Sequence, residues 1–375
     1  MLRGEIVVIG SRYHSAMRVN NKHLLVVISA HGYGHAAMTA PLVNALYALQ
    51  PTLSITIQSA VALPFLQRKF HMPFQHLANE TDFGMVNRDA FAVDMDASLQ
   101  RYRDFHQDWV GRIKAETASL VKLNADALLT NIAYLPLAAA AQLGLPSVAF
   151  GCLNWAEIFH HHFPDQHAIY QQMLAAYRSA DAFIRSEPAM PMAGLDSETV
   201  GPIAERGRMH RHELLRSLGV PSQTKLVLAT MGGIKTEMDV ANWPRLDNVH
   251  YLIPDIASAQ RDDISSLSTA EMDFIDMLRS ADALLTKPGY GAFTEAAFNR
   301  TPVLYVERPD WPEHRYLCRW LERHLPSRAI SRRQFSQGEF GAELSWLLRQ
   351  PVHPQAPTAG LEQALAVLCR HLKIE

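Results

Sequence analysis

The stretch LLTKPGYGAFTEAAF, residues 284–298, decides how the second half of this chain folds. Its apolar start predicts a buried strand that ends at Lys287. A proline and two glycines then bend the chain, and a helix is expected to begin near Ala292–Thr294. The first N–H groups of a helix have no partners within it, and they carry the positive end of the helix dipole. The pattern therefore predicts an anion-binding turn between a strand and a helix.

A diphosphate can approach the backbone closely at glycines, and the hydroxyl of Thr294 can add a donor. Phosphate would repel the Glu295 carboxylate, but a ribose diol would suit it. A plain glycine turn with helix-start residues explains the stretch about equally well. The spacing is neither that of a P-loop nor that of a complete Rossmann fingerprint, which disfavours a nicotinamide cofactor. The candidate diphosphate- and ribose-contacting residues of this stretch are Lys287, Pro288, Gly289, Gly291, Ala292, Phe293, Thr294 and Glu295.

Short apolar runs alternate with helical patterns along both halves of the chain. This spacing indicates right-handed βαβ units and parallel sheets that are covered on both faces. Residues 201–224 are rich in Gly, Pro and charge, and they are interpreted as a linker. Strands are predicted at 23–29, 53–59, 125–131, 146–151, 180–187, 225–233, 249–254, 282–287 and 301–307.

The alternation predicts an α/β protein with two Rossmann-like, doubly wound domains that face each other across a cleft. We expect the first domain at residues 1–200, the second at 225–355 and a final helix at 356–375. Residues 1–16 are expected to be a loose extension. Ligands of such sheets bind beyond the carboxyl ends of the strands. Gly232 and Gly233 follow a strand there, and they form either a plain turn or a site for the distal phosphate.

Composition excludes several functional classes. The chain has 375 residues, of which 48% are hydrophobic and 19% charged, with a formal net charge of −2. This nearly neutral balance predicts no overall positive charge that would attract nucleic acid or an anionic membrane. No apolar stretch is long enough to span a membrane. The 3 cysteines form no disulfide framework, which favours a reducing, cytoplasmic location.

A second glycine-rich turn, SAHGYGHAAM at residues 29–38, follows the first predicted strand. It contains His31, Gly32, Tyr33, Gly34 and His35. Taken alone, it fits a phosphate-binding loop, a loop with a catalytic histidine, or a tight turn between a strand and a helix.

Two further clusters in the first half contain candidate functional residues. Asn154, Trp155 and Glu157 follow a strand end, where ligands of such sheets bind, and Trp155 either stacks on a ligand ring or packs in the core. The run FHHHF at 159–163 invites a zinc site. Consecutive histidines on a helix point in different directions and no Cys or carboxylate set accompanies them, so we expect no metal site.

Five stretches together resemble the GT-B glycosyltransferases. The narrower resemblance is to the glycosyltransferase-like region before the kinase domain of plant L-arabinokinases, and to its stand-alone bacterial relatives. The stretches occur in the family's order: AHGYGH (30–35), FAVDMDASLQRY (91–102), NADALLTN (124–131), LNWAEIF (153–159) and KPGYGAFTEAAF (287–298).

The resemblance implies a GT-B fold with an acceptor domain first, a nucleotide-sugar domain second, and a last helix that crosses back to the first domain. It implies that Glu295 binds the ribose and that Ile253 and Pro254 border the base. Glu313 and His314 would approach the donor sugar. Residues 31–34 and Asn154, Trp155 and Glu157 would lie on the acceptor side, where Trp155 could stack on a sugar.

In the first domain, the family's catalytic histidine falls on His35, and Met38 stands near a place where the family often has an arginine. A histidine with a pKa near 6.5 can take a proton from an acceptor hydroxyl at neutral pH. His31 competes for this role, with backbone hydrogen bonding in a turn as its alternative. Asp94, in the DMD run at 94–96, either caps a helix or orients His35.

The leading hypothesis is a metal-independent, inverting glycosyltransferase that moves a sugar from a nucleotide-sugar donor to an unidentified acceptor hydroxyl. The nucleotide sugar is the substrate, and no cofactor is expected. The alternatives are a sugar-nucleotide epimerase or hydrolase of the same fold, and a non-catalytic nucleotide-sugar-binding protein. The oligomeric state is left open.

Overall fold

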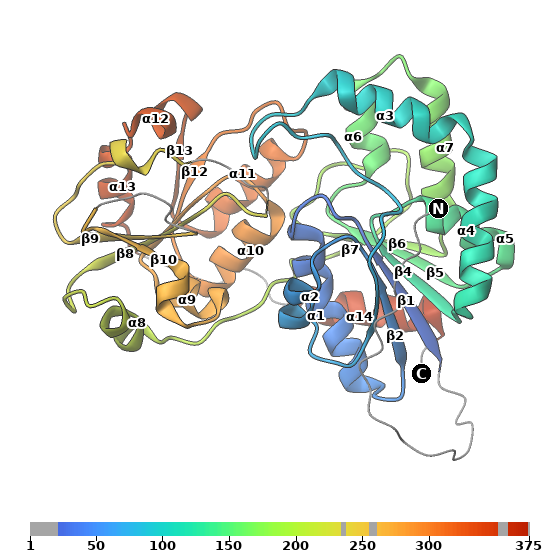
Figure 1. Cartoon of the computed structure of the whole chain (residues 1–375), viewed down its shortest axis with the longest axis horizontal. Coiled ribbons are helices and arrows are strands. Elements are labelled where there is room, and N and C mark those ends of the chain that lie inside the picture. The colour runs from blue at the N-terminus through green and yellow to red at the C-terminus, as the bar shows by residue number, and fades with distance from the viewer. Residues whose placement is uncertain (1–21, 234–237, 255–260, 352–358, 374–375) are drawn as a thin grey trace. The chain divides into compact units, whose positions relative to one another are not determined.

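The structure is a computed structural model that describes residues 22–233, 238–254, 261–351 and 359–373, and it contains two parallel sheets flanked by helices (Figure 1). The predicted α/β class with two Rossmann-like sheets is confirmed. The expected extension at residues 1–16 lies outside the described residues. Among the described residues, no helix is long and apolar enough to cross a membrane.

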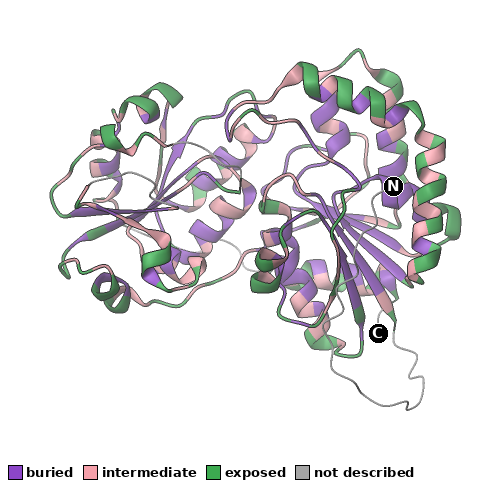
Figure 2. Ribbon diagram, in the orientation of Figure 1, coloured by how far each residue is buried: buried purple, intermediate pink, exposed green. Residues whose placement is uncertain are grey.

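The first sheet has the strand order β3-β2-β1-β4-β5-β6-β7, and every neighbouring pair is parallel. β4 and β5 are buried along their whole length, as expected for central strands that helices cover on both faces (Figure 2). The strands are β1 (His23–Ile28), β2 (Ser54–Gln58), β3 (Gln75–Leu77), β4 (Ala127–Asn131), β5 (Ser147–Gly151), β6 (Ala182–Ser186) and β7 (Glu198–Val200).

Helices surround this sheet. α1 packs on the central strands and on α14, while α5 packs on β4 and β5 and against α4 and α7. The helices are α1 (Gly34–Leu49), α2 (Leu63–Lys69), α3 (Met95–Gln107), α4 (Trp109–Leu123), α5 (Leu135–Leu143), α6 (Trp155–His162), α7 (His167–Arg178) and α14 (Gly360–Leu372).

The second sheet has the order β10-β9-β8-β11-β12-β13 and is also parallel throughout. Its strands are β8 (Lys225–Thr230), β9 (Val249–Ile253), β10 (Ile264–Ser266), β11 (Ala283–Thr286), β12 (Val303–Val306) and β13 (Ser327–Ile330). Its helical segments are α8 (Arg211–Ser217), η1 (Val240–Asn242), η2 (Leu267–Ala270), α9 (Phe274–Ser280), α10 (Tyr290–Asn299), α11 (His314–His324), α12 (Arg332–Gln337) and α13 (Gly341–Leu347).

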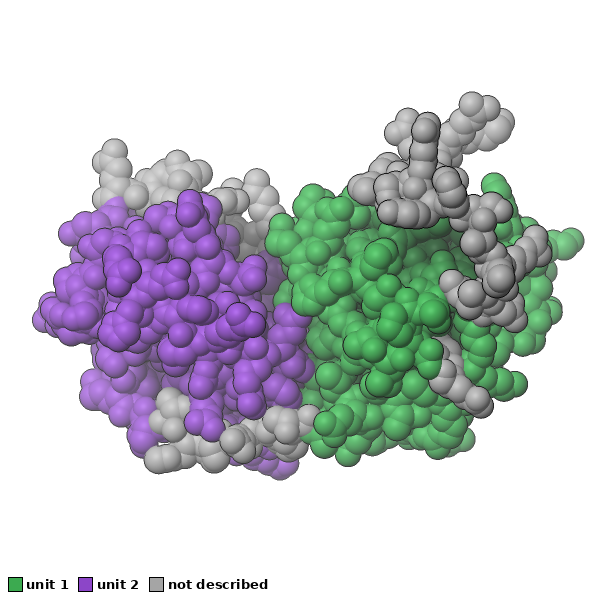
Figure 3. All heavy atoms as spheres, turned by 90° about the horizontal axis from the view of Figure 1, so that it is seen from below, with its two compact units in different colours: residues 1–88, 93–203, 359–375 green, residues 89–92, 204–358 purple. Residues whose placement is uncertain are grey.

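The two compact units of the chain are not contiguous in sequence (Figure 3). The first unit comprises residues 1–88, 93–203 and 359–375, and so includes α14. The second comprises residues 89–92 and 204–358. The stretch 201–224, expected to be a linker, contains α8. The cleft between the two domains stays a prediction.

Residues 89–92 are the tip of a loop that leaves the first unit and returns to it. Asn87 and Val93 form an antiparallel bridge at its base. The Asp89 carboxylate accepts hydrogen bonds from the backbone N–H groups of Phe91 and Ala92, at 2.6 and 2.8 Å, and thereby closes the tip. Ala90 and Phe91 belong to the hydrophobic core of the second unit, where the Phe91 ring lies 6.0 Å from that of Phe335. We call residues 89–92 the strap.

Candidate functional site

Each sheet has one point where the strand order reverses. In the first unit β1 lies between β2 and β4, and in the second β8 lies between β9 and β11. The helices that follow the two strands at such a point leave toward opposite faces, which opens a crevice beyond the strands' carboxyl ends. The 29–35 turn follows β1, and the 287–291 turn follows β11. Both glycine-rich turns that the sequence singled out therefore lie at a topological switch point.

In the first unit, the switch-point turn presents His35 in the first turn of α1. Gly32 has a φ of +84°, a left-handed conformation that glycine adopts without strain. Tyr33 is the N-cap residue and Gly34 begins the helix, so His35 is its second residue. A side chain at Gly34 would meet nothing within 4 Å, so the helix start beside His35 is open.

Hydrogen bonds around His35 fix which ring nitrogen carries its proton. The Thr39 hydroxyl donates to the His35 backbone carbonyl at 2.7 Å, so its oxygen is left to accept from the Asn131 amide nitrogen at 2.8 Å. The Asn131 amide oxygen then faces Nδ1 of His35 at 2.8 Å. An oxygen there can only accept, so Nδ1 carries the hydrogen and Nε2 of the neutral ring keeps its lone pair.

The same site keeps His35 neutral. Burial lowers the pKa of His35 below its ordinary value of 6.5, and the hydrogen bond to Asn131 opposes this shift only in part. A half-buried, neutral imidazole with a free Nε2 is suited to accept a proton.

A buried tryptophan supports both histidines of the turn. The Trp155 ring lies 5.1 Å from the ring of His31 and 5.6 Å from that of His35, measured between centroids. Its indole N–H donates to the Asp82 carboxylate at 2.7 Å, and the Ser29 hydroxyl donates to the same oxygen. Burial raises the pKa of Asp82 to about 6. Sequence reasoning missed Asp82, which lies in a loop without a periodic pattern.

Several first-unit candidates have structural roles. Trp155 is 0% exposed and cannot stack on a sugar in this structure. The side chain of Asn154 caps α6 by accepting from the backbone N–H of Glu157 at 2.9 Å, and it too is 0% exposed. Glu157 is half-buried and accepts a long hydrogen bond from the Tyr170 hydroxyl at 3.5 Å. Met38 is buried in the core and supplies no charge.

Asp94 does not orient His35 in this structure. Its carboxylate caps α3 by accepting from the backbone N–H of Ala97 at 3.1 Å, and it pairs with Arg88 at 3.2 Å. The position beside Nδ1 of His35 belongs to Asn131, the last residue of β4. His31 lies against a different group, because its Nε2 is 3.2 Å from the Asn87 amide nitrogen. Tyr33 is 41% exposed and stacks on Phe65.

In the second unit, the switch-point turn leaves backbone N–H groups open. Gly289 is the N-cap residue of α10, and its carbonyl accepts the first helical hydrogen bond from Phe293 at 3.1 Å. The N–H groups of Gly291 and Ala292 precede that bond and have no partner within the helix. A side chain at Gly291 would meet nothing within 4 Å. This helix start can therefore receive an anion.

The helix begins earlier than expected, which changes the roles of three candidates. Because Tyr290 is already helical, Thr294 lies in the second turn, and its hydroxyl donates back to the Tyr290 carbonyl at 2.9 Å. Thr294 is therefore not a phosphate donor in this structure. Phe293 is buried against Tyr305 in the core. Glu295 is 8% exposed, so little of it is accessible.

Two cationic side chains follow strands at the same end of the sheet as this helix start. The turns after β8 and β11 lie side by side. A Cβ atom placed at Gly232, whose φ is +77°, would lie 3.8 Å from Cε of Lys287. Burial and the neighbouring Arg308 lower the pKa of Lys287 to about 8, while Glu313 opposes the shift. Arg308, two residues beyond β12, is a candidate that sequence reasoning missed.

The remaining donor-side candidates differ in how far they are buried. Glu313 is buried and accepts a hydrogen bond from the Trp311 indole N–H at 2.8 Å. His314 begins α11, with its ring 6.5 Å from that of Tyr305, and burial lowers its pKa. The side chain of Ile253 lies in the core, which leaves its backbone for contact with a base. Gly233 is exposed, Pro254 is half-buried and Pro288 is buried.

No set of three metal-ligating residues gathers anywhere in the described part of the chain. The histidines of α6 instead lie against rings, and His160 stacks on Tyr170 at 4.3 Å.

Comparisons with solved structures define the class of fold. The glycotransferase of kitacinnamycin superposes with a TM-score of 0.58 at 16% identity, over 94% of this chain and 95% of that one. A proposed UDP-N-acetylglucosamine 2-epimerase from Listeria monocytogenes gives 0.58 at 14% identity, over 95% and 97%. The chain has the GT-B fold of glycosyltransferases. No family model matches it.

Among curated proteins, the chain is similar to L-arabinokinase from Arabidopsis thaliana, with 23% identity over 350 residues. The match covers 87% of this chain and 32% of that protein, so the chain spans about a third of the length of its relative. The resemblance stated from the sequence motifs is confirmed.

Proposed function

We propose that this protein transfers a sugar from a nucleotide-sugar donor to an acceptor hydroxyl, with His35 as the base. The observation that carries the proposal is the His35–Asn131–Thr39 network, because it leaves Nε2 unprotonated beside an open helix start at a switch point. Nε2 would take the hydroxyl proton while the acceptor oxygen forms a bond to the anomeric carbon. The bond from that carbon to the diphosphate oxygen breaks, and inversion follows from attack on the opposite side.

The second unit supplies what the leaving diphosphate needs. The open N–H groups at the start of α10 and the Lys287 ammonium would stabilise the charge that develops on the diphosphate. Gly232 and Gly233 would let the distal phosphate approach the backbone. Glu295 would contact the ribose through its carboxylate. These groups provide positive charge without a metal, so we propose a metal-independent reaction.

A binding screen on the intact protein tests the donor assignment. UDP-, GDP- and dTDP-sugars, whose leaving groups are diphosphates, would be added in turn while the melting temperature is measured. At least one should raise it, because a ligand that binds only the folded state stabilises that state. The increase should be lost in Glu295→Ala. The proposal fails if no nucleotide sugar raises the melting temperature.

Turnover separates this function from two alternatives. The likeness to the proposed epimerase favours a second candidate, in which the sugar nucleotide is isomerised or hydrolysed. Transfer releases a nucleoside diphosphate only in the presence of an acceptor, and it should persist in EDTA. Hydrolysis releases the diphosphate without an acceptor, whereas epimerisation returns an isomeric sugar nucleotide. Binding without turnover of any kind would identify a nucleotide-sugar-binding protein.

A further inference from the structure

Arg308 is a buried cation with incomplete hydrogen bonding. Its side chain lies beyond the carboxyl end of β12, and the residue is 5% exposed. Nε donates to the Phe91 carbonyl of the strap at 3.3 Å, and the guanidinium lies 4.4 Å from the Trp311 ring centroid. Nη2 is buried and has no hydrogen-bond partner among the described residues. No carboxylate of the described chain lies within ion-pair distance of this arginine.

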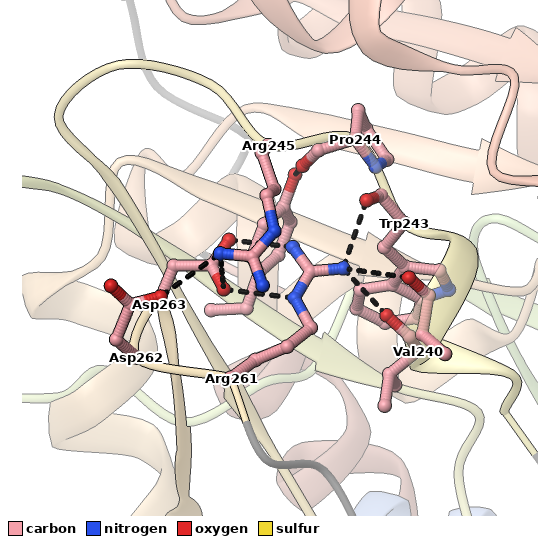
Figure 4. Close-up of polar contacts among 9 residues, drawn as sticks. Val240, Trp243, Pro244, Arg245, Arg261, Asp262 and Asp263 are labelled. Carbon is pink, nitrogen blue, oxygen red and sulfur yellow. Dashed lines mark hydrogen bonds and ion pairs between the residues drawn. The ribbon is translucent and has the colours of Figure 1, made fainter.

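A second arginine of the same unit shows how a buried guanidinium is normally satisfied (Figure 4). The side chain of Arg261 is also 5% exposed. Its Nε and Nη2 donate to the two oxygens of Asp263 at 2.8 and 2.5 Å, and Nη1 donates to the carbonyls of Val240 and Trp243 at 2.7 and 2.9 Å. Arg261 is held by a complete set of structural partners, and Arg308 is not.

The unpaired group lies beyond the carboxyl ends of the strands, where ligands of such sheets bind. β12 is the neighbour of β11, with Tyr305 paired to Thr286, so Arg308 and Lys287 follow adjacent strands at the same end of the sheet. Adjacent strands are about 4.8 Å apart. The pKa of Lys287 is lowered in part by Arg308, and burial lowers the pKa of Arg308 itself to about 10. Both side chains therefore carry charge at neutral pH.

The two cations share one buried carboxylate among the described residues. Glu313 is the carboxylate that faces both cations, and its Oε2 already accepts from Trp311. Asp310 and Asp89 also act on Arg308, but Asp310 is exposed and Asp89 binds the strap backbone. A buried charge without a close partner is costly unless an ion of opposite sign binds it.

We propose that Arg308 binds an anionic oxygen of the donor through Nη2. The identity of the donor rests on the proposed function. A planar guanidinium recognises phosphate and carboxylate oxygens equally well. The oxygen belongs either to the diphosphate or to a carboxylate on the transferred sugar, and the two sources are separated by experiment.

Titration calorimetry on the full-length protein tests the assignment. The probes are inorganic pyrophosphate, UDP, GDP and dTDP, together with the pair UDP-glucose and UDP-glucuronic acid. If Arg308 binds the diphosphate, Arg308→Gln should weaken pyrophosphate and the diphosphates by about 10- to 100-fold. If it binds a sugar carboxylate, those affinities stay unchanged and a preference for UDP-glucuronic acid over UDP-glucose is lost.

Arg332→Gln is the matched control. Arg332 also contacts the strap, through Asp89 at 3.5 Å and the Phe91 ring at 5.0 Å, but it is exposed and paired. Its loss should leave every affinity unchanged. The melting temperature without ligand gives a second readout. Arg308→Gln should lower it less than Arg261→Gln, because Arg308 loses one long hydrogen bond and a ring contact, whereas Arg261 loses four short hydrogen bonds.

Two results would overturn the inference, but only the second would also overturn the proposed function. If the wild-type protein binds the probes and Arg308→Gln binds all of them equally well, Arg308 is not a ligand contact and the proposed function stands. If the wild-type protein binds no probe, both proposals fail.

Discussion

The tripeptide Gly-Tyr-Gly occurs at both switch points, at residues 32–34 and 289–291, but the two copies fold differently. The first glycine has a left-handed φ of +84° at Gly32 and an extended backbone at Gly289. α1 begins at the third residue of its copy, whereas α10 begins at the second. The second position of the helix is consequently His35 in one unit and Gly291 in the other.

A shift of one residue in the helix start thus separates two kinds of chemistry. In the first unit the open helix start carries an imidazole whose Nε2 is free to accept a proton. In the second unit it carries no side chain, so the backbone N–H groups of the helix start are open. Under the proposed function, the turn of the first unit accepts a proton and the turn of the second holds negative charge. Substitutions at each turn should therefore affect different kinetic constants.

The largest effect is expected from His35→Ala. Loss of a general base typically lowers kcat by about 10²- to 10⁴-fold, and donor affinity should stay unchanged because the cations lie in the other unit. Steady-state kinetics and donor titration measure the two quantities. His31→Ala is the matched control, since His31 contacts the same Trp155 ring but lies beside the Asn87 amide. Transfer that persists at the wild-type rate in His35→Ala would refute the base assignment.

Lys287→Met should give the converse result. Removing a charge that binds phosphate should weaken the donor by about 10- to 100-fold, seen as a raised Kd by calorimetry. Lys225→Met is the control, because Lys225 forms a partly exposed ion pair with Asp282 at 3.0 Å and such pairs contribute little. Equal donor affinity in wild type and Lys287→Met would remove Lys287 from the donor site.

A smaller effect, about 10-fold in kcat, is expected from Asn131→Leu, because the imidazole loses the acceptor that fixes its tautomer. Asn131→Asp should restore orientation and place a carboxylate beside Nδ1. That charge favours the imidazolium and raises the pKa of His35, so the acidic limb of the pH–rate profile should move to higher pH. A limb at the same pH in both proteins would count against Asn131 as the positioning residue.

The smallest expected effect is the pH dependence of kcat/KM, which should have an acidic limb from His35 and an alkaline limb from Lys287. His35 must be neutral, and burial lowers its pKa, so activity should fall only as pH drops below 6.5. Lys287 must be charged, and its pKa is about 8, so donor binding should weaken as pH rises through that value. Lys287→Met should remove the alkaline limb and leave the acidic one. Loss of the acidic limb instead would reverse the two assignments.

The sequence predicts the long central strands correctly because each is a continuous apolar run buried on both faces. β3, β7 and β10 are three residues long and partly exposed, so they leave no such run. The start of α10 was misplaced for a similar reason. Glycines signal a turn, but only the backbone shows that Gly289 is extended and Tyr290 is already helical.

The contacts within the candidate site depend on which strands are neighbours in the sheet more than on local sequence motifs. Asn131 ends a predicted strand, but its contact with His35 spans 96 residues and depends on β1 and β4 being neighbours. A search for polar residues at the ends of predicted strands would have found Asn131 and Arg308 together. The Asp94 motif was a helix cap, the commoner role of an acidic residue before a helix.

The strap also bears on how the chain can be divided. Because Ala90 and Phe91 complete the core of the second unit, residues 204–358 alone are not an exchangeable module. A chimaera that replaced only that segment would pair a foreign core with the original strap, and Arg308 would lose the carbonyl that holds its Nε. Recombination between relatives therefore has to carry two separate pieces of chain, one of them only four residues long.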